Sequence, residues 1–406
     1  MTTLRKVCFL LSTLSISGGL YVILQHALHM RRKGIDVTLA TPAAVGDSAE
    51  WHRAFRELPC SSVEELADQR FDLAVATWWE SVYDLPRIRS ATYAYFVQNA
   101  DFLLSAPALR ERAERTYSFG LPAITVSESL ADVLTERYGM QTAVALNGID
   151  KQIFRRAGPA FAPRVNGRLR VLVEGPFGAR TKGVAHAITL ARQSRADEIW
   201  LLTSSPVNWY PGVARVFSGL DAEGCAGVYR SCDVLLKLST LESCSLPILE
   251  MMHCGGMAIT YDIPAPNEYL VNGRNSLLLP IDQDRAAVAA IDVLKRAPTL
   301  LQWTTEGAKA TAATWPNWEE SSDAFLQHCR SIAIGPTVTR AALQAAIDTP
   351  VEPAARPGAV EMVREGLKSA VKPMIARSRR LQEIKTIARA LLLERGAPPR
   401  AEIWGA

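Results

Sequence analysis

The sequence lacks the features that mark several classes of protein. No apolar run reaches 18 residues, so no membrane-spanning helix is expected. The seven cysteines form no Cys-x-x-Cys pair and are too few for a disulfide scaffold, which predicts reduced thiols in a cytoplasmic protein. Aromatic residues make up only 7% of the 406 residues, but 48% are hydrophobic. That apolar fraction excludes wholesale disorder, and the length predicts two domains.

Most of the chain has no excess of charge of either sign, and the excess of positive charge is confined to its C-terminal end. The net charge is only +4. From Val351 onward there are 11 basic and 6 acidic residues, whereas the first 350 residues are near neutral. We expect the basic end to dock on an anionic membrane surface, at the inner face of the cell membrane, or to contact an acidic protein. A plain solvated helix is the alternative.

Strand-like and helix-like segments alternate, a pattern typical of a parallel sheet covered on both faces. Arg5 and Lys6 precede an apolar run as in a signal peptide, but no cleavage site follows, so the run is interpreted as the first strand. The predicted strands are 6–13, 35–41, 73–77, 93–98, 123–127, 143–146, 169–174, 199–203, 234–238, 257–260 and 276–279. The predicted helices are 20–33, 129–138, 184–193, 247–254, 284–296 and 318–334.

A run of turn-forming residues at 147–163 interrupts this alternation and predicts a linker between domains. The predicted fold class is α/β, with two Rossmann-like, doubly wound parallel-sheet domains at residues 1–155 and 164–317. A closing helix is expected at 318–336. Residues 337–406, which are interrupted by prolines and then rich in Arg and Lys, are expected to form a basic helical extension.

Two loops are candidates for binding an anion. Gly18 and Gly19 lie between a strand and a helix, where the backbone can approach a ligand closely; a tight turn without a ligand is the equal alternative. The spacing Gly-x-Gly-x-x-Gly is absent, so a dinucleotide cofactor is not expected. The loop 174–183 is not a Walker loop, but Arg180 and Lys182 make a diphosphate site plausible. A solvated basic loop is its alternative.

The stretch 239–250 is the most informative part of the sequence. Pro247 suits a first helical turn, which predicts a helix start with Ser245 near its cap. Glu242 precedes this helix and Glu250 lies in its early turns, where carboxylates can accept paired hydroxyls of a ribose or hexose. Acids near a helix N-terminus also have a purely stabilising role. Glycoside hydrolysis by the two carboxylates ranks lower, because the cationic loops suit a phosphorylated donor better.

The motifs, taken in their order along the chain, resemble those of the retaining glycosyltransferases of family 4. Glu242 and Glu250 stand in the E-x7-E arrangement of that family, and residues 147–150 are similar to its Asn-Gly-Val-Asp. Residues 227–234 and 267–275 resemble the segments before and after E-x7-E. The resemblance covers residues 6–334 and implies the GT-B fold, in which two Rossmann-like domains face a cleft.

The resemblance also implies a function. A sugar would be moved from a nucleotide diphosphate sugar to a glycan or lipid-linked acceptor, with retention of configuration, no metal, no cofactor and no nucleic acid partner. His26 and His29 are three residues apart on a predicted helix, but the sequence offers no third ligand beside them, so no metal site is expected there either. The implied roles are charge neutralisation of the diphosphate by Lys182, sugar binding by Glu242, ribose binding by Glu250, phosphate binding by the amides of Ser245 and Leu246, and a glycine loop at Gly18 and Gly19.

The sequence departs from the family pattern at two sites. The usual Gly-Arg before the lysine reads Pro176-Phe177, which leaves Arg180 as a candidate replacement. The usual mid-domain histidine is missing from 95–101, a variant similar to the rhamnosyltransferase-like branch, so Gln98 and Asp101 become candidates for contacting sugar or acceptor. Trp78 is a further candidate for stacking on an acceptor, with interdomain packing as its alternative. These departures keep open a non-catalytic nucleotide- or glycan-binding subunit that assists a partner transferase.

Overall fold

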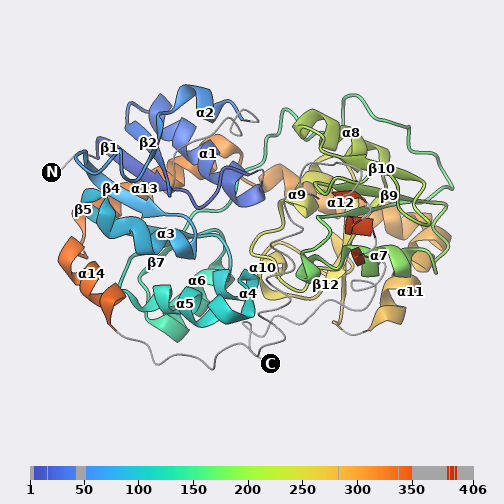
Figure 1. The fold of residues 1–406 in the computed structure, drawn as a ribbon. Coiled ribbons are helices and arrows are strands. Elements are labelled where there is room, and N and C mark those ends of the chain that lie inside the picture. The colour runs from blue at the N-terminus through green and yellow to red at the C-terminus, as the bar shows by residue number, and fades with distance from the viewer. Residues whose placement is uncertain are drawn as a thin grey trace. The chain divides into compact units, whose positions relative to one another are not determined.

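The computed structural model describes residues 4–15, 17–42, 52–281, 283–336, 338–349, 382–383, 385–387 and 389–390. The chain divides into two units (Figure 1). Unit 1 comprises Met1–Gly148 with Pro316–Arg356, and unit 2 comprises Ile149–Trp315 with Pro357–Ala406. The chain first passes from unit 1 to unit 2 between residues 148 and 149.

Unit 1 is built on a seven-stranded sheet of the order β3-β2-β1-β4-β5-β6-β7, and all its strand pairs are parallel. Its strands are β1 (Lys6–Leu10), β2 (Asp36–Thr41), β3 (Cys60–Ser62), β4 (Arg70–Ala76), β5 (Arg89–Val97), β6 (Ala123–Thr125) and β7 (Thr142–Val144). Its helices are α1 (Gly18–Arg32), α2 (Ala54–Glu57), α3 (Trp79–Asp84), α4 (Asp101–Leu104), α5 (Arg110–Arg115), α6 (Glu128–Tyr138), α13 (Trp318–Ile334) and α14 (Arg340–Asp348).

Helix α13, predicted as a closing helix, is part of unit 1 and packs on α1. The ring of His26 stacks on Phe325 with centroids 4.2 Å apart, and its Nδ1 lies 2.9 Å from Ser322 Oγ. His29 Nε2 lies 2.7 Å from Asp323 Oδ1. Both histidines are buried and face α13, so they hold that helix against α1.

Gly148, in the predicted Asn-Gly-Ile-Asp motif, has a structural role where the chain leaves unit 1. A Cβ at this position would lie 2.6 Å from backbone atoms of Asn317 and Trp318, at the start of α13. Gly148→Ala should therefore lower the free energy of unfolding by about 1–3 kcal/mol, because two stretches of backbone must separate. Urea denaturation of the variant measures this loss. Gly18→Ala, where the added Cβ meets nothing within 4 Å, is the control; equal stability of the two variants would contradict the prediction.

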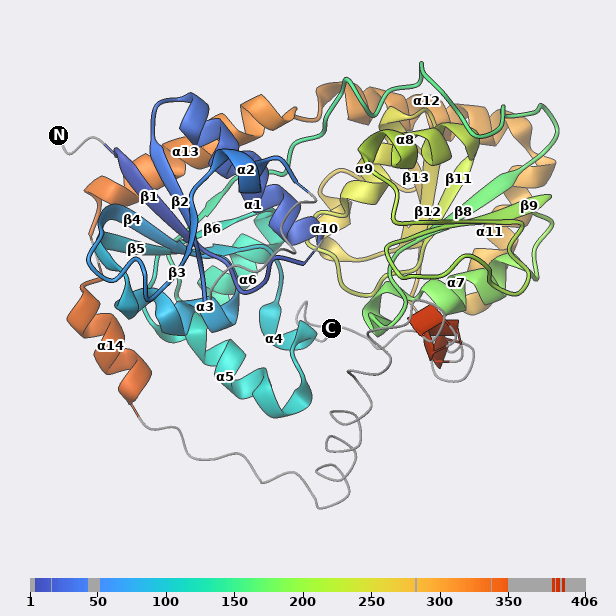
Figure 2. The ribbon, with the colours of Figure 1, turned by 45° about the horizontal axis from the view of Figure 1, so that its top comes forward.

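Unit 2 contains a six-stranded parallel sheet of the order β10-β9-β8-β11-β12-β13. Figure 2 shows helices on both faces of this sheet, with α7 and α11 together on one face and α9 and α12 on the other. The strands are β8 (Arg170–Glu174), β9 (Glu198–Thr203), β10 (Arg215–Ser218), β11 (Val234–Lys237), β12 (Met257–Tyr261) and β13 (Ser276–Leu279). The helices are α7 (Val184–Ala191), α8 (Ala222–Ser231), α9 (Leu246–His253), α10 (Pro264–Asn267), α11 (Asp284–Arg296) and α12 (Pro298–Thr314).

The predicted fold class, two Rossmann-like parallel-sheet domains, is confirmed by these two units. β13, α11 and α13 have the predicted bounds, and the other predicted elements differ from the observed ones by a few residues. The short edge strands β3 and β10 and the helices α2, α3, α4, α5, α8, α10 and α12 were not predicted, whereas α14 lies within the expected helical extension. Most of the predicted basic extension, 337–406, lies outside the described residues. In the part of the chain that is described, no helix combines the length and the apolarity needed to cross a membrane.

Candidate functional site

The main candidate site lies in unit 2, where the strand order reverses between β8 and β11. Ligands of such sheets bind at the carboxyl ends of the strands at this switch point. Glu174 ends β8 and Lys237 ends β11, so the parallel pairing of these strands brings the two side chains together. The Lys237 Nζ atom lies 2.6 Å from Glu174 Oε2, although the two residues are far apart in sequence.

Glu242 and Lys182 extend this pair into a row of four alternating charges. Lys182 Nζ donates to Glu242 Oε2 at 2.9 Å, and Lys237 Nζ lies 3.6 Å from Glu242 Oε1. The side chains of Lys237 and Glu242 are only 3% and 7% exposed, whereas that of Lys182 is 24% exposed. The row is therefore closed to solvent at Lys237 and open at Lys182, where a ligand can reach it.

Burial and charge compete at the two buried members of this row. Burial opposes ionisation of Glu242, but the opposing charges of Lys182 and Lys237 outweigh it and lower the pKa to about 2. Burial likewise opposes the charge of Lys237, yet Glu174 and Glu242 raise its pKa. Both groups are therefore ionised at neutral pH, so Glu242 presents only hydrogen-bond acceptors to a ligand.

The loop 174–183 brings Lys182 to this position through its backbone conformation. Gly175 has φ +139°, and a Cβ there would lie 2.9 Å from Val184 Cγ2. Gly183 has φ +60° and precedes α7. The Thr240 amide donates to the Thr181 carbonyl at 2.9 Å, which ties the loop after β11 to the loop after β8. Arg180, the other predicted donor-binding residue of the loop, is exposed.

The helix start predicted near Pro247 is present, since α9 begins at Leu246. Ser245 precedes it with φ +61° and ψ +66°, and among the described residues it is the one non-glycine residue with positive φ. This conformation is unfavourable for a residue with a Cβ. It places the first-turn amides, including that of Leu246, at the carboxyl end of β11, where they can bind an anion.

The segment 267–275 stabilises the loop before α9, a role that its sequence did not indicate. The buried Tyr269 hydroxyl donates to the Cys244 carbonyl at 2.7 Å. Asn275 in turn donates from Nδ2 to the Tyr269 carbonyl at 2.7 Å and to Thr311 Oγ1 of α12 at 2.8 Å. A Cβ at Gly307 of α12 would lie 1.9 Å from the Arg274 carbonyl oxygen, so this helix packs closely on the segment.

Glu250, on α9, faces a different environment from that of Glu242. Burial and the nearby charge of Glu174 raise its pKa to about 8, while a hydrogen bond from Tyr229 and the charge of Lys237 act in the other direction. Glu250 is therefore largely protonated at neutral pH. A neutral carboxyl group can both donate to and accept from a ribose hydroxyl.

The raised pKa of Glu250 predicts a pH dependence of stability. The folded state keeps a proton that the unfolded state releases near pH 4.5, so stability is highest below that pH and falls as pH rises to about 8. Glu250→Gln should remove this loss and be several kcal/mol more stable than the wild type at pH 8.5, at about 1.4 kcal/mol per unit of pKa shift, with little difference at pH 4.5. Denaturation curves between these pH values measure it, with Glu306→Gln, on the exposed face of α12, as the control. Equal gains at both pH values would contradict the prediction.

The candidate residues of unit 1 lie at the carboxyl ends of β1, β4 and β5, which are neighbours in the sheet. Ser17 caps α1 by accepting from the Leu20 amide at 3.2 Å, and Gly18 and Gly19 form its first turn. Gln98 donates from Nε2 to the Gly19 carbonyl at 3.1 Å, so the predicted glycine loop and the predicted contact residue Gln98 meet. The half-buried Trp78 immediately precedes α3.

Asp101 is surrounded by protein. It is 2% exposed, and its Oδ2 accepts from the Tyr95 hydroxyl at 2.5 Å and from the Trp79 amide at 3.0 Å. Burial raises its pKa to about 7, against the effect of these two hydrogen bonds. These contacts assign Asp101 a structural role at the start of α4, and its predicted contact with sugar or acceptor stays a prediction.

Lys237 and Glu174 are the residues of the candidate site in unit 2 that the sequence interpretation missed. The feature of the sequence that could have indicated Lys237 is a lysine within an apolar strand.

No group of three or more His, Cys, Asp or Glu side chains suited to a metal ion occurs among the described residues.

Residues 215–310 match the family model "Glycosyl transferases group 1". This match includes Lys237, Glu242, Ser245 and Glu250 but not Glu174 or Lys182.

Two curated relatives each share 28% identity with the chain. One is the O-antigen biosynthesis protein RfbC of Myxococcus xanthus, aligned over 66% of this chain and 21% of the relative. The other is a D-inositol 3-phosphate glycosyltransferase of Rhodococcus erythropolis, aligned over 41% of this chain and 34% of the relative. The chain therefore spans only about a fifth to a third of the length of these relatives.

Solved structures show the same fold at low sequence identity. HepE of Anabaena, solved in complex with UDP-glucose, has a TM-score of 0.64 and 14% identity, over 80% of this chain and 99% of that one. A sucrose-phosphate synthase of Thermosynechococcus elongatus has a TM-score of 0.66 and 14% identity, over 81% and 99%. The chain thus has the predicted GT-B fold, and the residues of unit 2 that carry Glu242 and α9 match the group 1 glycosyl transferases.

Proposed function

We propose that the chain is a glycosyltransferase that moves a sugar from a nucleoside diphosphate sugar to a glycan or lipid-linked acceptor, with retention of configuration. The observation that supports it most directly is the pair of Glu242 and Lys182 next to the start of α9. An ionised carboxylate, an accessible cation and free helix amides suit a donor that joins a neutral sugar to a diphosphate. UDP-glucose in the similar HepE structure supports the same donor class.

The proposed mechanism is mainly electrostatic. Lys182 and the amides of Ser245 and Leu246 would neutralise the departing nucleoside diphosphate. Glu242 would accept hydrogen bonds from the sugar hydroxyls and hold the sugar in place, and Glu250 would bind the ribose. The acceptor hydroxyl would then attack the oxocarbenium-like sugar from the face that the diphosphate leaves. This chemistry requires no metal, because the lysine and the helix amides supply the positive potential.

The family and the branch that we propose for the chain rest on the sequence resemblance. Membership of the retaining family 4 is supported by the spacing of Glu242 and Glu250. Similarity to the rhamnosyltransferase-like branch is supported by Gln98, which contacts the Gly19 carbonyl. The relative RfbC is an O-antigen biosynthesis protein, which supports a polysaccharide or a lipid-linked glycan as the acceptor class.

Hydrolysis of the donor in the absence of acceptor tests the proposal. The purified chain should slowly hydrolyse at least one of a panel of UDP-, GDP-, dTDP- and ADP-sugars. Glu242→Gln should lower the rate by about 100-fold or more, because the sugar loses an ionised acceptor at the reacting centre. Glu319→Gln, on the surface of α13, is the control. Nucleotide binding without hydrolysis or transfer across the panel would instead identify a non-catalytic binding subunit.

A further inference from the structure

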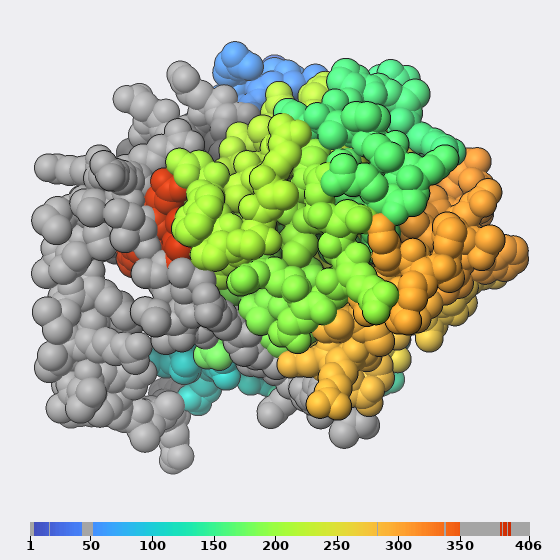
Figure 3. Space-filling model, turned by 90° about the vertical axis from the view of Figure 1, so that its right-hand side faces the viewer, coloured from blue at the N-terminus to red at the C-terminus, as the bar shows by residue number. Residues whose placement is uncertain are grey.

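The described residues near the C-terminus, 382–383, 385–387 and 389–390, pack against the rest of unit 2 beside the loop that carries Lys182. Asn208 donates from its backbone amide and from Nδ2 to the Glu383 carboxylate, at 2.9 and 3.3 Å. Ala390 is fully buried. Figure 3 shows these residues, in red, against the yellow-green residues that follow β9. This C-terminal segment therefore has a defined place at the carboxyl ends of β8 and β9.

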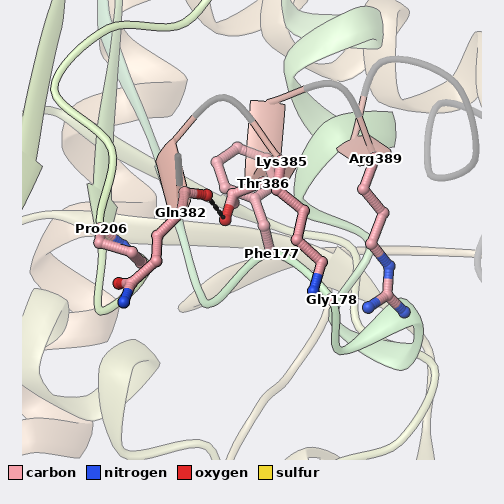
Figure 4. Close-up of a pocket in the computed structure, with 7 residues that line it drawn as sticks. All are labelled: Phe177, Gly178, Pro206, Gln382, Lys385, Thr386 and Arg389. Atoms are coloured by element: carbon pink, nitrogen blue, oxygen red, sulfur yellow. Dashed lines mark hydrogen bonds between the residues drawn. The ribbon is translucent and has the colours of Figure 1, made fainter. Parts of the chain in front are cut away.

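A cavity of about 280 Å³ separates the C-terminal segment from the loops of unit 2. One side is formed by Phe177 and Gly178 of the loop 174–183 and by Pro206 after β9 (Figure 4). The other side is formed by residues on one face of the helical segment, namely Gln382, Lys385, Thr386 and Arg389. None of these lining residues is acidic, so the cavity combines two cations with a glycine backbone.

The two cations point at the glycine of the loop. Lys385 and Arg389 are four residues apart, which places them on the same face of a helix. Figure 4 shows both side chains extending from the helical segment toward Gly178. A Cβ at Gly178 would lie 3.7 Å from Arg389 Nη1, and its φ of +95° is one that glycine adopts readily. The only acidic residue described in the segment, Glu383, is held by Asn208.

The loop itself has no cation in its first half. Residues 174–179 read Glu-Gly-Pro-Phe-Gly-Ala, and its basic residues, Arg180 and Lys182, stand at its end. We propose that Lys385 and Arg389 supply this missing charge and form, together with the backbone at Gly178, a subsite for a phosphate group. The identification of that phosphate as part of a nucleoside diphosphate donor rests on the proposed function. Charge-assisted hydrogen bonds from a guanidinium and an ammonium suit phosphate oxygens.

Binding measurements on the full chain test the subsite. The double variant Lys385→Ala/Arg389→Ala should bind the preferred nucleoside diphosphate (from UDP, GDP, dTDP and ADP) and inorganic pyrophosphate about 10- to 30-fold more weakly. Its affinity should also depend less on salt concentration, because fewer charges contact the ligand. Arg296→Ala/Lys309→Ala is the charge-matched control, since both of those side chains are 61% exposed on α11 and α12.

The outcomes separate this inference from the proposed function. Unchanged affinity of the double variant for both probes, or wild-type protein that binds neither, would overturn the subsite. Pyrophosphate binding that is lost in the double variant, in a protein that binds no nucleoside diphosphate, would support the subsite and contradict the proposed function. If the double variant lost only its binding to phosphatidylglycerol vesicles and kept both affinities, the two cations would belong to a membrane-facing surface, and the subsite would be overturned.

Discussion

Replacing Lys237 by methionine is expected to lower the free energy of unfolding by about 3–5 kcal/mol. The lysine is 3% exposed and lies between two carboxylates, 2.6 Å from Glu174 Oε2 and 3.6 Å from Glu242 Oε1. Methionine fills a similar volume but leaves two negative charges that repel each other in a site with little access to water. Breaking a buried pair by removing one partner is costly for this reason.

The electrostatic origin of this loss can be separated from a packing defect. In Lys237→Met the pKa of Glu242 should rise from about 2, because one of the two charges that lower it is gone. The variant should therefore be less impaired at pH 5 than at pH 8. Glu242 keeps its partner Lys182 in this variant, whereas Glu174 loses Lys237. Adding Glu174→Gln therefore removes the uncompensated charge and should restore part of the lost stability, which a double-mutant cycle measures as a coupling energy.

Urea denaturation at both pH values provides the measurement. Lys309→Met is the control, because that lysine pairs with Glu306 on the surface and an exposed pair contributes only about 0–1 kcal/mol. If Lys237→Met does not fold, the double variant with Glu174→Gln still tests the argument. Equal instability of the single and double variants at both pH values would show that Lys237 acts through packing alone.

The local pattern of the sequence predicted most of the fold. The hydrophobic periodicity located the core strands, since a parallel strand buried on both faces reads as a continuous apolar run, as in Val7–Leu10. Edge strands such as β3 and β10 are short and partly exposed, so they leave no such run. Helix α12 contains five threonines and one glycine, which are poor helix formers, and it forms because it packs on α9 and β12.

The site was predictable only where its signal is local. Glu242, Pro247 and Lys182 belong to recognisable loop and helix-start patterns. The partnership of Glu174 with Lys237 depends on β8 and β11 being adjacent, which follows from the strand order and not from the spacing along the chain. The hydrogen bonds that Asp101 accepts from Tyr95 and Trp79 likewise depend on tertiary packing, so no local pattern indicated them.

Lys182→Ala is expected to weaken the binding of the nucleoside diphosphate donor by about 10- to 100-fold. The Lys182 ammonium is the accessible end of the row of charges, and one donated hydrogen bond, to Glu242 at 2.9 Å, leaves two further N–H groups for phosphate oxygens. The proposed diphosphate site depends on these donors. Loss of the lysine should also raise the pKa of Glu242, which lies beside it.

The size and selectivity of this effect distinguish a phosphate contact from a general disturbance of the loop. Titration calorimetry should show a large loss for a nucleoside diphosphate and little change for the corresponding nucleoside, which has no phosphate to lose. Lys182→Arg keeps the charge and should retain part of the affinity, although the planar guanidinium places its donors differently. Arg180→Ala, in the same loop and exposed, should have a smaller effect, because its side chain is not held beside Glu242. A donor affinity unaffected by Lys182→Ala would overturn the assignment of the diphosphate to this loop. Equal weakening of nucleoside and nucleoside diphosphate would instead show that Lys182 only maintains the loop between β8 and α7.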